Sequence, residues 1–180
     1  MLTEIGGRDH ADRNVIVGTR GVHVSGNLNF VYNNYIGTDR RGSVGLGVVD
    51  PTSIGIFVNS DSNVFESNVI GGYDTAVRLL TDNSGNQFLS NKIGTDRTGS
   101  TPIPNGVGLQ IGGSGITTQV TIGGSASDAN TIAYNTEQGI LLTDANNVEI
   151  AHNAIHNNRV GIDTTSVSYT HLTLPTIYSV

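Results

Sequence analysis

The chain has 180 residues, of which 36% are hydrophobic and 24 are glycine, and it contains no tryptophan and no cysteine. This composition excludes a thick core of large side chains but allows a thin one of Val, Ile and Leu, and a formal net charge of −6 without a basic cluster argues against nucleic acid as a partner. No apolar run is long enough to span a bilayer, the first residues do not resemble a secretory signal segment, and the absence of cysteine leaves the redox compartment open.

A three-residue phrase, Asn-x-Ile, recurs along the chain. Each copy is followed by a small residue that opens an apolar-x-apolar triplet, and the spacing from that small residue to the next Asn is nearly constant apart from one insertion. The six asparagines are Asn14, Asn34, Asn68, Asn91, Asn130 and Asn153. A core unit of roughly twenty residues, with length variation confined to particular corners, predicts a solenoid.

The first complete repeat contains three short alternating runs, at 22–24, 29–32 and 34–36, separated by polar or glycine positions. Runs of this kind predict strands. Because they are too short for hairpins, we expect them to wind into coils that stack as parallel sheets. Met1–Gly7 resembles the end of a preceding repeat, so we expect further coils of the same chain at both ends.

Two long corner loops interrupt the later repeats. The phrase GTDRRGS begins at Gly37, and its near copy GTDRTGS begins at Gly94. Further apolar triplets predict strands at 56–58, 77–79, 109–111 and 140–142, and a Gly/Ser/Asp loop expands a different corner between 122 and 130.

The recurrent Asn has a physical explanation in a stacked fold. Asn tolerates the left-handed backbone conformation of a tight bend, and its amide can bond to the same residue one coil away. Six such residues would form a ladder, while the Ile two positions on would point into the core. The alternative is that Asn is simply common in loops.

The order of the phrases is also specific. Ile-Gly-Gly, Arg-Asn-Val-Ile, Gly-Val-x-Val, Gly-Asn and Asn-Tyr-Ile-Gly-Thr-Asp follow one another, and this order resembles the right-handed parallel β-helix repeats of bacterial secreted and surface proteins in the pectin-lyase-like superfamily. The resemblance covers Ile5 to Asp163, with Thr19 standing where such repeats often have Asn. It implies an all-β, single-stranded right-handed parallel β-helix of about six coils. It also implies an extracellular or cell-surface location.

The last residues, Val167–Val180, contain no charge, no Asn, no Gly and no repeat phase. They resemble the translation of a transposon-end sequencing adapter. We therefore assign the fold to residues 1–166 and interpret 167–180 as read-through. The alternative is a real terminal strand over Tyr169–Leu174.

The middle residues of the apolar triplets should point outward and form one stripe along the stack. This stripe consists of His23, Phe57, Arg78, Gln110, Leu141 and Asp163. In related β-helix enzymes the polysaccharide lies along this face, and the loops Thr38–Ser53 and Thr95–Asn105 would lean over it. His23, Phe57, Arg78, Gln110 and Asp163 are thus candidate sugar contacts, although an ordinary solvated sheet face has the same composition.

Asp39 and Asp96 are the candidate catalytic pair. They hold the same place in the two Gly-Thr-Asp loops, so strands spaced by ~4.8 Å put their backbones about 10 Å apart. That is close to the ~6.5–9.5 Å carboxylate separation of inverting glycosidases. The competing interpretation is that a repeated Asp serves a repeated turn by capping its amides.

Motifs of the related enzymes are missing. The sequence has no Asn-Thr-Asp, no paired Asp-Asp, no Gly-His-Gly and no Arg-x-Lys phrase. Asp74 and Asp82 flank Arg78 at strand ends, which does not make a convincing calcium cluster, and no glycine-rich calcium nonapeptide is present. We therefore expect neither a metal site nor a cofactor, and calcium has no motif to support it.

Two interpretations from different classes follow. In the first, the chain is a non-catalytic stretch of an extracellular bacterial β-helix that serves as a stalk, an adhesin or a carbohydrate-binding scaffold. In the second, it is part of a polysaccharide lyase or inverting glycoside hydrolase with its substrate along the stripe. An enzyme needs convergent carboxylates or Arg beside a wall of loops, whereas a scaffold needs polarity and repetition. Repetition dominates the sequence, and we favour the scaffold.

Overall fold

The computed structural model describes residues 2–47, 50–80 and 83–164. Within this part, nearly all regular structure is β-strand, and the only helices are two short 3₁₀ turns, η1 (His10–Asp12) and η2 (Ala126–Asp128). The segment 167–180, interpreted from sequence as read-through, lies outside the described residues.

The strands fall into three columns. The first column contains β3 (Arg20–Val24), β6 (Ile54–Val58), β9 (Thr75–Leu79), the opening parts of β12 (Val107–Gly123) and β14 (Gln138–Ala151), and β16 (Val160–Asp163). The second contains β1 (Glu4–Gly6), β4 (Phe30–Tyr32), β7 (Val64–Glu66), β10 (Gln87–Leu89) and the later parts of β12 and β14. The third contains β2 (Val15–Ile16), β5 (Tyr35–Ile36), β8 (Val69–Ile70), β11 (Lys92–Ile93), β13 (Thr131–Ala133) and β15 (Ala154–His156).

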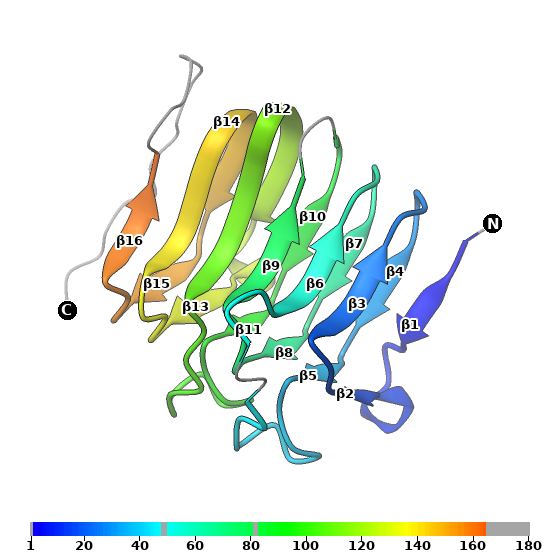
Figure 1. Cartoon of the computed structure of the whole chain (residues 1–180). Helices are drawn as coiled ribbons and strands as arrows, with labels where there is room; N and C mark the ends of the chain where they lie inside the picture. Colours follow the sequence, from blue (N-terminus) through cyan, green and yellow to red (C-terminus); the bar gives the residue numbers. More distant parts are fainter. Residues whose placement is uncertain (1, 48–49, 81–82, 165–180) are drawn as a thin grey trace.

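All neighbouring strands in these columns are parallel. In the early repeats each strand pairs with the strand three places later, as in β1–β4–β7 and β2–β5–β8. We call each set of three consecutive strands a coil. Because β12 and β14 run through two columns, the described residues form one ten-stranded and one six-stranded sheet, which curl around a common interior (Figure 1). The prediction of an all-β, solenoid-like stack of parallel strands is confirmed.

The interior is a thin layer of aliphatic side chains stacked in register. Ile36, Ile70 and Ile93 are at most 1% exposed and sit above one another in β5, β8 and β11. In the second column Phe65 and Phe88 stack with ring centroids 4.8 Å apart. Each coil therefore buries its apolar residues only against the coils before and after it.

The asparagines of the Asn-x-Ile phrases form one hydrogen-bonded column beside the third sheet column. The backbone N–H and the Nδ2 of each donate to Oδ1 of the next, as from Asn34 to Asn68 at 2.9 and 3.2 Å. The same pairs of bonds link Asn14, Asn34, Asn68, Asn91, Asn130 and Asn153 in turn. The second Nδ2 hydrogen of Asn68 goes to the carbonyl of Val31 at 2.8 Å, so this buried amide makes four bonds.

The expectation that these asparagines adopt the left-handed conformation is wrong. At four of the six positions the positive φ belongs instead to the preceding residue: Asn33 at 56°, Ser67 at 60°, Ser90 at 55° and His152 at 61°. Before Asn14 and Asn130 the φ is negative as well, −62° at Arg13 and −57° at Ala129. The reason is geometric: the column Asn must direct its own N–H toward the next coil, so the residue before it makes the bend. The left-handed position thus lies one place earlier than the sequence pattern suggested.

Asparagines also pin the two other corners, which the sequence analysis missed. Asn29, Asn63 and Asn86 form one further column, with backbone N–H to Oδ1 distances of 2.9 and 3.0 Å. The other contains Asn105, Asn135 and Asn158, joined by bonds of 3.0 Å to each Oδ1. A weaker form of the same signal, Asn followed two residues later by an apolar residue, precedes Val31, Phe65 and Phe88.

A tyrosine takes the place of asparagine at one corner of the early coils. The backbone N–H of Tyr73 donates to Oδ1 of Asn105 at 3.1 Å, which continues that column, and its ring then lies along the corner past Gly55 and Gly37. A Cβ at Gly37 would lie 2.4 Å from Cε2 of this ring, so glycine makes room for it. Burial raises the pKa of Tyr73 to about 12, against a smaller lowering by the backbone of Gly18.

The Asn68→Ala variant tests the column. It should lower the free energy of unfolding by about 2–4 kcal/mol, because buried donors and acceptors on both neighbouring coils lose their partner. Urea unfolding followed by circular dichroism measures the change. Asn59→Ala, at an exposed asparagine outside the columns, is the control and should stay within about 0.5 kcal/mol. Equal effects of the two changes would contradict the role of the column.

Tyr73 makes a prediction for alkaline pH. Because its pKa is raised from 10.0 to about 12, the folded state holds the phenol proton more tightly than the unfolded state. Its contribution to stability is therefore complete below pH 10 and is lost as the pH rises toward about 12. Tyrosinate absorbance should show one late-titrating phenol, and Tyr73→Phe should remove both that phase and its share of the alkaline loss of stability.

Candidate functional site

The residues of the predicted outer stripe are paired with one another across neighbouring strands. His23 pairs with Phe57, Phe57 with Arg78, and Arg78 with Gln110, and the series continues through Leu141 to Asp163. These side chains are exposed or half-buried, and from His23 to Leu141 their strand neighbours are buried, as alternation in a strand requires. The stripe runs along the first column of strands.

Aromatic and cationic groups gather at the early end of the stripe. The rings of His23 and Phe57 meet edge to face with centroids 4.9 Å apart, and the guanidinium of Arg20 lies 5.0 Å from the centre of the Phe57 ring. Farther along, Nε of Arg78 is buried and has no hydrogen-bond partner within the described residues. This segment offers both a stacking surface and a cation.

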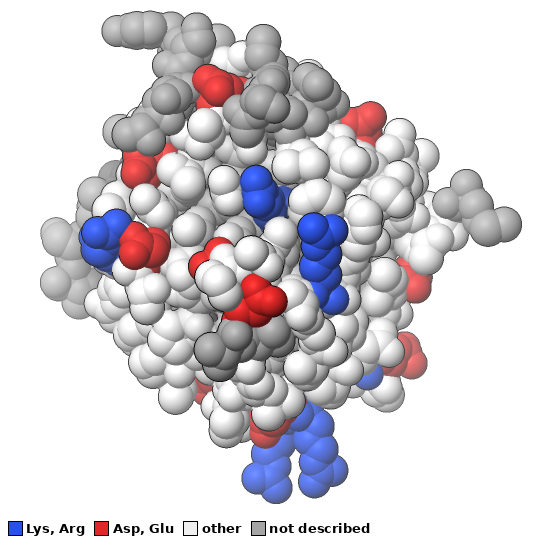
Figure 2. All heavy atoms as spheres, in the orientation of Figure 1, with Lys and Arg blue, Asp and Glu red and all other residues white. Residues whose placement is uncertain are grey.

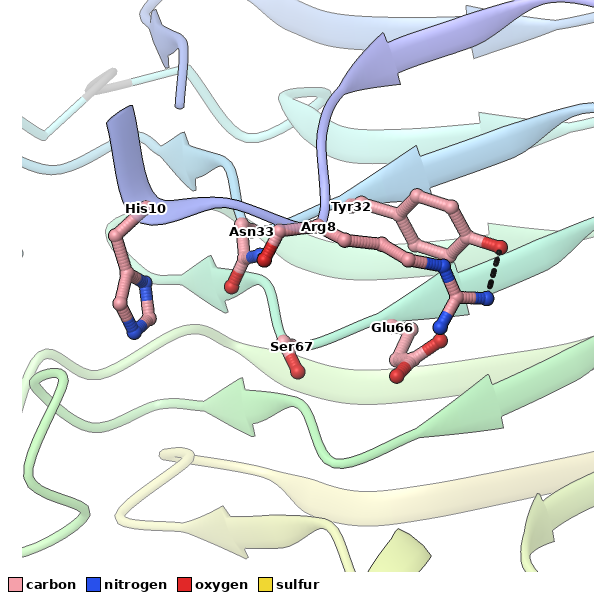
Figure 3. A pocket seen from close by; sticks show the side chains of 6 residues that line it. All are labelled: Arg8, His10, Tyr32, Asn33, Glu66 and Ser67. Carbon is pink, nitrogen blue, oxygen red and sulfur yellow. Dashed lines mark hydrogen bonds between the residues drawn. The ribbon is translucent and has the colours of Figure 1, made fainter. Parts of the chain in front are cut away.

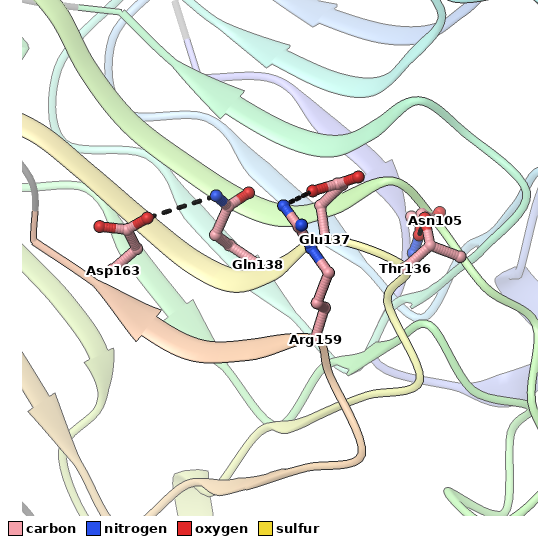
Figure 4. Close-up of polar contacts among 6 residues, drawn as sticks. All are labelled: Asn105, Thr136, Glu137, Gln138, Arg159 and Asp163. Carbon is pink, nitrogen blue, oxygen red and sulfur yellow. Dashed lines mark hydrogen bonds and ion pairs between the residues drawn. The ribbon is translucent and has the colours of Figure 1, made fainter.

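The late end of the stripe is engaged in contacts of its own. Nε2 of Gln138 donates to Oδ2 of Asp163 at 3.3 Å, and Arg159 forms an ion pair with Glu137 just before β14 (Figure 4). The Asp163 carboxylate therefore holds β16 to β14 in addition to facing outward.

Charge on this face is dispersed. Figure 2 shows basic and acidic side chains scattered among neutral ones, with one close pair of opposite sign near an edge and two basic side chains projecting below. Such a face presents no extended field of one sign to a charged polymer.

The two long loops do not lean over the stripe with their tips, as the sequence analysis expected. Instead they fold back over the six-stranded sheet: a Cβ at Gly42 would lie 2.7 Å from Cζ of Tyr35, and Gly99 lies against Lys92. The intervening coil is short at this corner, so the loops also touch each other, with Arg97 N–H donating to Gly42 O at 2.8 Å. A shallow hollow of about 440 Å³ opens where the loops return to the first column.

Asp39 and Asp96 cap the loops in which they occur. Oδ1 of Asp39 accepts the backbone N–H of Ser43 at 2.8 Å and that of Val44 at 3.1 Å. Oδ1 of Asp96 accepts the corresponding amides at positions 100 and 101, each at 3.1 Å, and its carboxylate also accepts the Thr98 hydroxyl. The same bonds in both copies favour the turn-capping interpretation.

The protonation of the pair agrees with that role. The Ser43 amide is the main cause of a lowered pKa at Asp39. Burial alone would raise the pKa of Asp96, but hydrogen bonds from Thr101, Thr98 and Ser100 outweigh it, and the net pKa is lowered. Both carboxylates are ionised near neutral pH, whereas a general acid must retain its proton.

The structure also forms a cavity that the sequence analysis did not anticipate. It has a volume of about 230 Å³, lies where β4 and β7 end, and is lined by Arg8, His10, Tyr32, Asn33, Glu66 and Ser67 (Figure 3). These residues come from three separate stretches of sequence and share no motif. Only the stacking of the first coils brings them together.

Among the described residues, no group of three or more His, Cys, Asp or Glu side chains is arranged to hold a metal ion. No helix in this part of the chain is long and apolar enough to cross a membrane.

Comparison with known proteins gives no match: no protein-family model, no curated protein and no solved structure matches the chain. The fold and its surface therefore define a class rather than a family. That class is an all-β, solenoid-like protein of parallel strands, compatible with a β-helix.

Asp96→Asn tests the capping role. Because the pKa of Asp96 is lowered by folding, its contribution is present at neutral pH and lost as the pH falls below 3.8 through the folded-state pKa. The variant should therefore lose that acid dependence, and the amides of Ser100 and Thr101 should exchange hydrogen about tenfold faster at neutral pH. Arg97→Gln, an exposed change in the same loop, should leave both measurements unchanged; protected amides in Asp96→Asn would contradict the assignment.

Proposed function

We propose that the chain is a non-catalytic stretch of a right-handed parallel β-helix of the pectin-lyase-like type, serving as a scaffold on the outside of a bacterial cell. It would act as a stalk, an adhesin or a carrier of carbohydrate contacts. The observation that supports this proposal best is that the recurring polar residues are used to hold coils and loops together. The asparagines bond to asparagines, and the repeated Asp bonds to its own loop.

The hand of the winding follows from a general rule. Connections between parallel strands in the same sheet are right-handed in about 98% of cases, because twisted strands close back on the sheet that way. The three-column order and the sequence phrases fit that architecture. The extracellular location rests on the resemblance of the phrases alone.

The proposal includes further coils of the same chain, stacked on both ends of the sheets. The first and last strands of the columns, such as β2 and β15, have a neighbour on one side only among the described residues. Open edges of parallel sheet favour pairing with another strand. Additional coils would supply those neighbouring strands.

The second candidate is a polysaccharide lyase or glycoside hydrolase with its groove along the stripe. Arg78 is the observation in its favour, because its buried, unpartnered Nε lies between Phe57 and Gln110 in the register. A guanidinium so placed could bind an acidic sugar or assist proton removal. The ionised and capped Asp39 and Asp96 do not supply the proton donor of a hydrolase.

Turnover separates the two candidates. On pectin, polygalacturonate, alginate and neutral glucans, the protein should release no reducing ends and form no unsaturated products above a heat-denatured control. The Asp39→Asn/Asp96→Asn double variant and Arg78→Gln should behave as the parent does. Cleavage by the parent that is lost in either variant, with melting unchanged, would establish the enzyme and refute the scaffold.

A further inference from the structure

The cavity at the ends of β4 and β7 is built by the first loop folding over a corner. Nδ2 of Asn33 donates to the carbonyls of Gly7 and Arg8 at 2.8 and 3.0 Å, which fixes the loop to the end of β4. The guanidinium of Arg8 lies 5.0 Å from the ring centre of Tyr32, and its Nη2 donates to the Tyr32 hydroxyl at 3.3 Å. The cavity wall is thus positioned by contacts that do not require a ligand.

Opposite charges face the same space. Figure 3 shows Arg8, Tyr32 and Glu66 at one end of the cavity, His10 at the other, and Asn33 and Ser67 between them. Tyr32 and Glu66 are register partners at the ends of β4 and β7. Within the described residues, neither the Glu66 carboxylate nor the Ser67 hydroxyl has a hydrogen-bond partner, so both can bind a ligand.

A hydrogen bond from Arg13 sets the tautomer of a neutral His10 ring. Nη2 of Arg13 lies 2.8 Å from Nδ1 of His10, and a guanidinium can only donate. Nδ1 therefore accepts, and the neutral imidazole carries its hydrogen on Nε2. The cavity then offers donors from Arg8 and His10, an acceptor from Glu66, and hydroxyls that can do either.

We propose that this cavity binds one neutral, polyhydroxylated ring, a single sugar residue. An anion would face Glu66 and a cation would face Arg8, so either would meet a like charge in a small space. A sugar carries hydroxyls that both donate and accept, and adjacent hydroxyls can bond to a guanidinium and a carboxylate together. The volume of about 230 Å³ is below the ~300–1,000 Å³ of pockets for larger ligands, which fits one ring.

This inference goes beyond the scaffold proposal and does not rest on it. The stripe lies along the first column of strands, whereas Tyr32 and Glu66 end strands of the second. A protein that cleaved polysaccharide at Arg78 could still hold a sugar here, and a scaffold could lack one.

Titration calorimetry and ligand-observed NMR test the proposal with D-glucose, D-galactose and D-mannose as probes, and with D-galacturonate and D-glucosamine as charged counterparts. At least one neutral sugar should bind with a dissociation constant of roughly 1 mM, as expected for a small ligand in an open polar site. Its charged counterparts should bind at least about tenfold more weakly, because each meets Arg8 or Glu66 as a like charge.

Variants connect the binding to the cavity. Glu66→Gln and Arg8→Gln should each weaken it about tenfold or more, and Ser67→Ala about threefold. Glu149→Gln makes the same charge change at an exposed residue of β14 and should leave the affinity unchanged. Glu66→Gln is the decisive variant, since the Glu66 side chain has no bond to lose and folding should be intact.

Three results would overturn the proposal. The first is the absence of saturable binding by any neutral sugar. The second is tighter binding of galacturonate or glucosamine than of the neutral sugars. The third is binding that Glu66→Gln and Arg8→Gln leave unchanged, which would place the sugar elsewhere on the surface.

Discussion

The hydrogen bond between asparagine side chains one coil apart is the interaction on which the rest of this structure depends. At a buried position such as Asn68, the amide accepts two bonds from the coil before it and donates to the coil after it and to a carbonyl. A buried amide without partners would be costly, so the column forms completely or not at all. This requirement fixes the distance, direction and register of successive coils at their corners.

Pinned corners explain why such short strands suffice. β8 has only two residues, yet both are buried and paired on each side. Amide columns at the corners let the coils close over a thin core of Ile, Val and Leu, where Phe65 and Phe88 are the largest fully buried side chains. The column of Asn29, Asn63 and Asn86 stops at Asn86. In the following coils β12 and β14 run through this corner as continuous strand, and the buried Val120 takes the position that an asparagine would hold.

On the surface, too, the repeated residues serve mainly to hold the chain in place. In the repeated Gly-Thr-Asp loops, the carboxylates bind their own amides and the glycines adopt positive φ or sit against Tyr35 and Lys92. Features that do not repeat stand out against this background: the aromatic and cationic end of the stripe, and the polar cavity under the first loop. The candidate binding surfaces of this protein therefore lie where the repeat is broken.

The sequence by itself determined the stacked parallel strands, the outward stripe and the asparagines that bond to one another. Each of these depends on a spacing along the chain, and that spacing recurs from one coil to the next. It placed the left-handed residue one position late and overlooked two amide columns, since a bend is set by the direction of neighbouring N–H groups and weaker phrases lack the Ile. Only the tertiary structure decided which way the long loops fold and that Arg8, Tyr32 and Glu66 share a cavity. Those outcomes depend on packing between segments far apart in sequence, for which no local periodicity exists.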